Sequence, residues 1–316
     1  MKIQNVASLI ILVMGVFLIP SPAAAQVSAT ASGVPVQIIV GVEPKHGNEI
    51  PPIQQNEIFV HQGRNARPVT GWVPATGDNA GLALGILIDD SGGVNLGTQL
   101  NDLRAFIQQQ APTTRVAVAY MRNGTIMLTQ NFTKDHAPAA ASLRLPLGYF
   151  SVEASPYLSL SDFIKRWTTD PAVPRREILM ATSGIDTVYG GGLQNPYLDA
   201  AIQDAQCAGV VVSSIYTPSA GHFGHSYWRT YYAQIQLSQL SEETGGESYY
   251  LLGPQGPVAF TPYLDKLNHQ LANQYLLTFL AEPQKKASRV PIKISSEIHT
   301  VDFLYPDTVC VPAAPE

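Results

Sequence analysis

The feature that most constrains the fold is a continuous apolar run, Leu82 to Ile88 (LALGILI), which ends directly in residues 89–93 (DDSGG). A short apolar run without alternation is typical of a β-strand buried on both faces, and such strands belong to sheets that helices cover on both sides. In those folds, ligands bind beyond the carboxyl ends of the strands, where the loops converge. The polar residues after this run are therefore the first candidate functional site.

The segments that follow alternate between strand and helix patterns. Apolar residues spaced three or four apart predict helices, short apolar runs predict buried strands, and Asn123-Gly124 predicts a hairpin turn. This alternation favours an α/β fold with a doubly wound, mostly parallel, Rossmann-like sheet. The predicted strands are 82–88, 115–121, 125–129, 177–181, 210–217 and 248–252, and the predicted helices are 98–110, 159–167, 196–208 and 230–243.

The two ends of the chain follow a different pattern. Residues 34–74 contain short β-like runs broken by Pro, Gly and Asn, and the tail has a helical stretch, 261–273, followed by the β-like runs 275–281, 290–295 and 301–304. Consecutive strands without helices between them predict a small antiparallel annex built from both terminal segments. The predicted boundaries are 26–79 for an N-terminal β segment, 80–256 for the α/β domain, and 257–316 for the C-terminal helix and β annex.

The first 25 residues predict a signal peptide. Lys2 supplies the positive start, the apolar stretch 7–20 follows, and Ala23-Ala24-Ala25 provides small residues for cleavage. The apolar stretch is short for a membrane span, and no later segment reaches about 18 consecutive apolar residues. We therefore expect a periplasmic or secreted protein with no transmembrane segment after cleavage; an uncleaved N-terminal anchor is the alternative.

Charge and cysteine content narrow the function further. The formal net charge of −5, with 14% charged residues, argues against nucleic acid as a partner. An exported protein permits a disulfide between Cys207 and Cys310, but the sequence alone cannot bring the two residues together. Either a disulfide or two separate thiols fits the sequence.

Two enzymatic readings of residues 89–93 find little support. No Gly-rich phosphate-binding motif follows the strand. The segment Asp90-Ser91-Gly92-Gly93 resembles the surroundings of the catalytic serine of chymotrypsin-like proteases, but none of the seven histidines lies in a segment that resembles the histidine motif of that family. A hydrolase that uses Ser91 is kept as the alternative function.

The same segment resembles the von Willebrand factor type A domain, and more closely the exported bacterial proteins that carry a related version of it. The resemblance covers about residues 81–252. It rests on Asp89-x-Ser91 after the apolar strand, on the runs RVAVAYM, EILMATSG and GVVVSSIYT, and on a helix that ends in residues 243–246 (ETGG). In the closer relatives, a β segment precedes the domain and a helix plus a strand opening with Gln-Tyr follows it; residues 56–62 and 271–275 are similar to these.

The resemblance implies a binding function, often through a divalent ion held by Asp-x-Ser-x-Ser with a distant Thr and Asp. By position, Asp89 and Ser91 match the first two ligands and Ser155 matches the threonine. Gly93 stands in place of the second serine and Ser183 in place of the aspartate. Hard cations such as Mg²⁺ prefer oxygen ligands. Because two of the five ligand positions have lost their usual group, we expect Mg²⁺ or Mn²⁺ to bind weakly or not at all. Alternatively, Asp89 and Ser91 only hydrogen-bond the loop and cap the next helix.

Nearby residues complete the candidate surface. Asp90 and Asp186 are near enough in sequence to compensate for the missing carboxylate. Trp228 and Tyr231 either form a binding surface or pack on the sheet. His222 and His225 indicate a zinc site or, more simply, a surface loop.

The sequence therefore predicts an exported, non-enzymatic binding or adhesion-type module. Its binding face would comprise the loops 89–93, 155–158, 183–192 and 219–228, and its partner would be a protein or a cell-envelope component. A structural envelope subunit without a small ligand is the third possibility.

Overall fold

The computed structural model of the chain describes residues 33–47, 49–92, 96–148, 154–167, 173–219, 226–250 and 255–313. All of these belong to one compact unit, residues 31–316. The predicted signal peptide, Gly93 and the loop with His222 and His225 lie outside the described residues.

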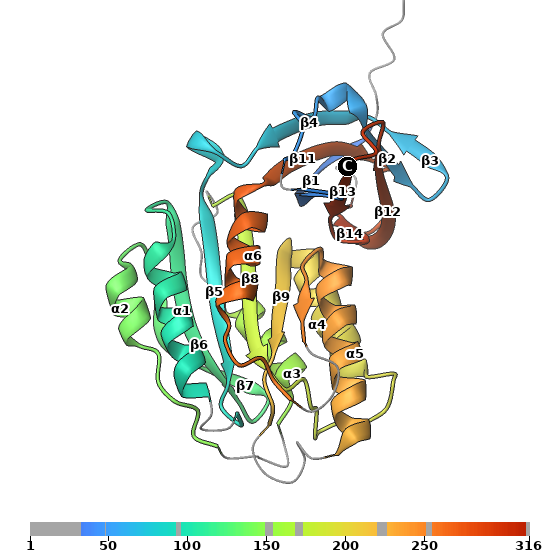
Figure 1. The fold of residues 1–316 in the computed structure, drawn as a ribbon. Coiled ribbons are helices and arrows are strands. Elements are labelled where there is room, and N and C mark those ends of the chain that lie inside the picture. Colours follow the sequence, from blue (N-terminus) through green and yellow to red (C-terminus); the bar gives the residue numbers. More distant parts are fainter. Residues whose placement is uncertain are drawn as a thin grey trace, which may run out of the picture. The chain divides into compact units, whose positions relative to one another are not determined.

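The central sheet has six strands in the order β10-β9-β8-β5-β6-β7, with β5 in its interior (Figure 1). All neighbours pair in parallel except β6 and β7, which form an antiparallel hairpin through Asn123 and Gly124. The α/β class is confirmed, but this sheet is mixed, and the molecule also contains antiparallel sheets. The strands are β5 (Leu82–Asp89), β6 (Thr114–Arg122), β7 (Thr125–Thr133), β8 (Arg175–Thr182), β9 (Val210–Tyr216) and β10 (Ser248–Tyr249).

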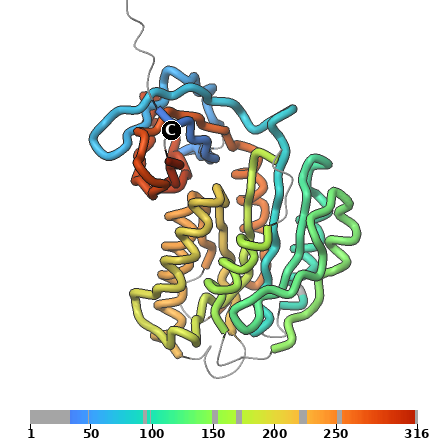
Figure 2. The backbone as a smooth tube through the Cα atoms, turned by 180° about the vertical axis from the view of Figure 1, so that it is seen from behind, coloured from blue at the N-terminus to red at the C-terminus, as the bar shows by residue number. Residues whose placement is uncertain are grey.

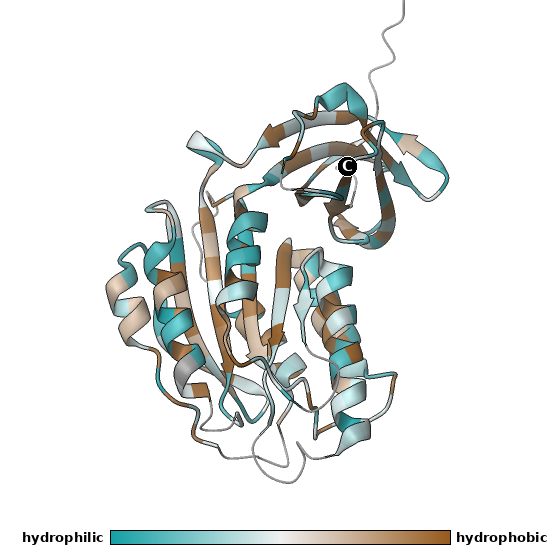
Figure 3. Cartoon of the chain, viewed as in Figure 1, coloured by the Kyte–Doolittle hydropathy of each residue, from teal (hydrophilic) through white to brown (hydrophobic). Residues whose placement is uncertain are grey.

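Helices cover both faces of this sheet, as Figures 1 and 2 show. Alternate residues of the strands point to opposite faces, so Leu84 and Ile86 pack with one set of helices and Leu87 packs with the other. The first set is α1 (Gly97–Gln109), α2 (His136–Ala141) and α6 (Thr261–Ala272); the second is α3 (Pro156–Lys165), α4 (Pro196–Ala208) and α5 (Tyr227–Thr244). Because β5 is buried on both faces, its residues are apolar from Leu82 to Ile88, and Figure 3 colours the strand predominantly brown.

The terminal segments form the annex together. β1 pairs antiparallel with β11, so residues from the two ends of the chain lie side by side in one sheet, ordered β13-β1-β11-β4. The second annex sheet is ordered β14-β12-β2-β3. The strands of the two annex sheets are β1 (Val34–Pro44), β2 (Ile58–Gln62), β3 (Asn65–Arg67), β4 (Val69–Pro74), β11 (Gln274–Ala281), β12 (Ser288–Ser296), β13 (Val301–Leu304) and β14 (Thr308–Val311). Two short 3₁₀ helices, η1 (Gln55–Glu57) and η2 (Gly77–Asn79), lie in the same part of the chain.

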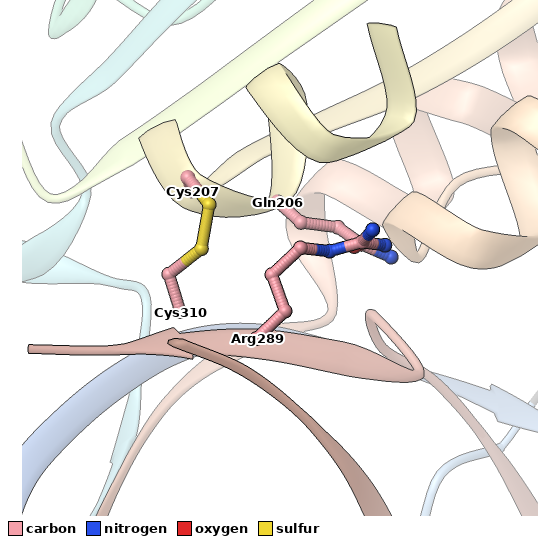
Figure 4. The surroundings of a disulfide bond; sticks show 4 residues. All are labelled: Gln206, Cys207, Arg289 and Cys310. Carbon is pink, nitrogen blue, oxygen red and sulfur yellow. A yellow bond between two sulfur atoms is a disulfide. The ribbon is translucent and has the colours of Figure 1, made fainter. Parts of the chain in front are cut away.

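Several contacts join the annex to the α/β part, among them a hydrogen-bond network around Arg175 and a disulfide. At the amino end of β8, Arg175 donates to the Leu271 carbonyl and to Gln274, and Gln274 donates to the buried carboxyl group of Glu177. A disulfide joins Cys207, near the end of α4, to Cys310 in β14, with a Cα–Cα distance of 4.9 Å (Figure 4). The structure thus decides in favour of the disulfide.

None of the helices in the described residues has the length and apolar character that a membrane crossing requires.

Candidate functional site

The carboxyl end of β5 presents Asp89, Asp90 and Ser91, and all three are buried. Parallel strands end at the same edge of a sheet, so neighbouring loops meet here. Gly92 forms an isolated bridge with Ser219, the Thr217 N–H donates to the Thr182 carbonyl, and the Gly148 N–H donates to the Asp90 carbonyl. The structure therefore brings together the described parts of the loops that the sequence predicted.

Both carboxylate oxygens of Asp89 accept hydrogen bonds from this chain. Oδ1 accepts from the Ser91 N–H at 3.0 Å and from the Ser91 hydroxyl at 2.6 Å. Oδ2 accepts from the Thr182 hydroxyl at 2.8 Å. Such bonds satisfy a buried carboxylate without a cation, which corresponds to the alternative in which Asp89 and Ser91 stabilise their own loop.

Asp90 is turned to a different partner. Its two oxygens accept from the guanidinium of Arg144 at 2.7 and 3.1 Å, and the Leu147 N–H donates to Oδ1 at 3.0 Å. The bond to Asp90 raises the pKa of Arg144, and the guanidinium also lies 3.8 Å from the ring centroid of Tyr120. Asp90 therefore anchors the segment after α2 and does not compensate for a missing ligand beside Asp89.

Ser155 and Asp186 form a second cluster. Ser155 is the N-cap of α3: its hydroxyl accepts from the Leu158 N–H and donates to Asp186 Oδ2 at 2.7 Å. The same carboxylate accepts from Asn195, the N-cap of α4, and from the Tyr189 N–H. Asp186 thus ties two helix starts to the loop after β8, which is a structural role within the predicted surface.

The residue that completes the Asp89 cluster is Thr182, not Ser183. The Ser183 hydroxyl accepts only from the Ile185 N–H among the described residues, whereas Thr182 is fully buried and bonds Asp89 directly. Side-chain alternation along β8 could have distinguished the two residues. Thr182 and Ser183 are adjacent in the chain, so their side chains point to opposite faces and only one of them can face Asp89.

The hydrogen bonding of the described carboxylates leaves little for a divalent ion to bind. No group of three or more His, Cys, Asp or Glu side chains within them could hold a metal, and the oxygens of Asp89 and Asp186 already accept from protein donors. Asp89 and Ser155 line a common pocket, but its volume is about 10 Å³, room for roughly one water molecule. The set Asp89, Ser91 and Ser155 therefore stays a prediction from resemblance that this geometry does not favour.

The geometry of Ser91 is also unlike that of a nucleophile. Its hydroxyl donates to a carboxylate, whereas a catalytic serine needs a general base, most often an imidazole, to take its proton. In the described part of the chain, the hydrogen bonds of His136 and His269 are made with Thr114 and Asn273.

An aromatic cluster lies at the start of α5, beside these loops. Trp228 is 64% exposed, Tyr227 is 60% exposed and Tyr231 is 41% exposed. The Tyr227 ring packs edge-on against Trp228 at 5.8 Å and is parallel to the ring of Tyr231 at 6.3 Å. The interpretation that Trp228 and Tyr231 pack on the sheet is therefore wrong. The other interpretation, that they form a surface available for binding, stays a prediction.

Comparison with known proteins gives likeness in structure only. No family model matches this sequence, and no curated protein matches it. An aerotolerance-related membrane protein from Bacteroides fragilis NCTC 9343 is 12% identical, with a TM-score of 0.43, over 60% of this chain and 98% of that one. A von Willebrand factor type A protein from Catenulispora acidiphila is 10% identical, with a TM-score of 0.44, over 90% and 75%.

In fold, this chain is similar to that von Willebrand factor type A protein. The pilus adhesin SpaC from Lactobacillus rhamnosus GG, 7% identical with a TM-score of 0.43, is matched over 82% of this chain but only 47% of its own length. At such identities and TM-scores the likenesses concern the fold alone, so the function is argued from the residues of this chain.

Proposed function

We propose that this chain is an exported, non-enzymatic protein-binding module whose contact surface is the aromatic cluster Tyr227, Trp228 and Tyr231, together with the neighbouring loops at the carboxyl edge of the central sheet. The observation that carries the proposal is the exposure of these three adjacent rings. Tyr and Trp are favoured in binding surfaces because they combine a large rigid area with a polar atom.

The closed hydrogen bonding of the loops supports a role without metal or catalysis. Asp89, Asp90 and Asp186 each bond to groups of this chain, which holds the described parts of these loops in place beside the aromatic cluster. A surface held in its binding conformation loses less conformational entropy when a partner binds. The partner class is a protein of the cell envelope or the exterior.

Site-specific photo-cross-linking tests this proposal. A benzophenone amino acid at Tyr231 should give a discrete protein adduct in the envelope fraction of the source cells, and Trp228→Ala in the same chain should abolish it. The matched control carries the photo-reactive group at Phe59 in the annex, which is 40% exposed and lies outside the proposed surface.

Two results would contradict the proposal. Identical adducts from positions 231 and 59 would indicate non-specific capture. The absence of any adduct from position 231 would mean that no partner protein contacts this surface. Labelling of Ser91 by a fluorophosphonate would instead support the hydrolase.

A further inference from the structure

The annex leaves the edge of one strand without a neighbour. β1 pairs with β11 along Val34–Gly41, but on its other side β13 pairs only with Gly41–Pro44. From residue 34 to residue 40, that second edge of β1 has no strand beside it among the described residues. An unpaired strand edge is a template for another extended chain.

The register shows which backbone groups face the open side. In an antiparallel pair, the N–H and C=O of one residue point to the same side, and the side alternates along the strand. The Val42 N–H donates to the Asn273 carbonyl on the β11 side, and the Lys45 N–H donates to the Thr300 carbonyl on the β13 side. Odd-numbered residues therefore face away from β11, so Gln37 and Ile39 each direct an N–H and a C=O to the open edge.

A cavity lies along this edge. Its volume is about 340 Å³, and residues 36–39 of β1 form one wall. The opposite walls come from the end of α4, the start of β9 and strand β14, including Val309 and the disulfide partners Cys207 and Cys310. Among the described residues, β14 pairs with β12 alone, so its other edge is also without a neighbouring strand.

The lining defines what would fill the cavity. Ile39, Val210, Val211 and Val309 give apolar walls, which suit β-branched side chains. Arg176 is the charged residue of this lining; it donates to the Ala208 carbonyl at 3.1 Å, and no other bond of its guanidinium is found among the described residues. Since a guanidinium carries five donors, it can still bind a carboxylate.

We propose that an extended segment of a partner protein adds as a strand to the open edge of β1, pairing with Gln37 and Ile39, and that an acidic side chain of this segment binds Arg176. Main-chain hydrogen bonds would supply affinity, and the apolar walls and Arg176 would select the sequence. This site uses the annex and the adjoining residues of β8, α4 and β9, but none of the residues of the aromatic cluster, so it stands or falls independently of the function proposed above.

The test uses a displayed library of random nine-residue peptides, selected on the purified chain. The expected peptides alternate β-branched residues with polar ones and carry an acidic residue. Gln37→Pro removes the outward N–H without removing a bond to β11, and should weaken binding about tenfold or more, the loss of roughly one or two hydrogen bonds. Gln37→Ala keeps the N–H and should bind within about twofold of the parent.

Two further measurements keep the test decisive even if Gln37→Pro melts far below Gln37→Ala. Arg176→Gln should weaken the acidic peptides several-fold more than versions whose acid is replaced by its amide. Hydrogen exchange should slow at the amides of Gln37 and Ile39 when peptide binds.

Several outcomes would overturn the proposal. These are a library without enrichment, enriched peptides that bind Gln37→Pro as tightly as Gln37→Ala, or protection confined to the loops around Asp186. A dimer of the chain that Gln37→Pro dissociates would also overturn it, because the occupant would then be a second copy.

Discussion

At the scale of single residues, Glu177 is the carboxyl group whose pKa is most strongly shifted among the described residues. It lies in β8 beneath the annex and is only 2% exposed. Burial raises its pKa from 4.5 to about 8, against the opposing effects of the Gln274 hydrogen bond and the charge of Arg175. Because the folded chain holds this proton more tightly than the unfolded chain, the free energy of unfolding should fall as pH rises from about 4.5 to about 8.

Glu177→Gln should remove this pH dependence. The substitution keeps the size of the side chain and cannot ionise, so the variant should be more stable than the parent at pH 8–9 by at least about 1 kcal/mol, since each unit of pKa shift corresponds to roughly 1.4 kcal/mol. Calorimetric melting at pH 5 and pH 9 measures the effect. Parallel pH profiles of the two proteins would show that Glu177 does not carry this dependence.

Asp89 gives the second prediction at this scale. Because three donors of the chain already bond its oxygens, millimolar Mg²⁺ or Mn²⁺ should leave the melting temperature unchanged, while Thr182→Val should destabilise the fold by about 1–3 kcal/mol through the acceptor it leaves unpaired. Titration calorimetry and thermal melting are the measurements. Millimolar or tighter metal binding that Asp89→Ala abolishes would contradict this and restore the ion site.

At the scale of elements, two helices end in the same way but in different surroundings. α4 ends at Gly209 with φ +63° and α5 at Gly245 with φ +86°, the left-handed conformation in which glycine commonly terminates helices. A Cβ on Gly209 would meet nothing within 4 Å, whereas one on Gly245 would lie 2.8 Å from the backbone of Tyr305 and Pro306. The absence of a side chain at Gly245 therefore also allows residues 305–306 of the annex to lie close to the end of α5.

This difference makes a paired prediction. Gly209→Ala should cost about 1 kcal/mol, the usual strain of a left-handed non-glycine residue, and Gly245→Ala should cost clearly more because backbone atoms must also move. Urea denaturation of both variants measures the two costs. Equal losses would mean that the contact with residues 305–306 is not constrained.

At the scale of the whole molecule, the annex is joined to the α/β part by the disulfide and by the Arg175 network. Cys207 and Cys310 are separated by 103 residues, so their bond constrains a long loop of the unfolded chain. Chain-entropy arguments assign such a loop up to about 4.7 kcal/mol, with measured values typically about 2–4 kcal/mol.

The double variant Cys207→Ser/Cys310→Ser should therefore unfold at lower urea concentration, with a loss of about 2–4 kcal/mol. Addition of a thiol reductant should lower the stability of the parent and leave the double variant unchanged, which is the control. A parent that is insensitive to the reductant under unfolding conditions would contradict a formed disulfide.

Much of the fold was predictable because its signals are local. The apolar run of β5 placed the strand and Asp89 correctly, and the Gly209 and Asn123-Gly124 signals marked a helix end and a hairpin. The short helix α2 and strand β14 were missed, since neither has a strong periodic pattern, and α5 begins three residues earlier than predicted. The predicted strand 248–252 is described only at Ser248–Tyr249 as strand.

The candidate site was less predictable. Sequence position predicted that Asp89, Ser91, Ser155 and Asp186 lie at one edge of the sheet. It did not predict that Asp90 bonds Arg144, that Thr182 and not Ser183 bonds Asp89, or that Trp228 is exposed.

By itself the sequence determined most of the strands and helices, that the central strands are buried, and which loops share an edge, because these follow from apolar periodicity and chain direction. Only the tertiary structure decided which donor each carboxylate bonds, that Cys207 meets Cys310, and that β1 keeps an open edge. Those facts depend on distances between residues far apart in the chain, and such distances are set by how the layers pack.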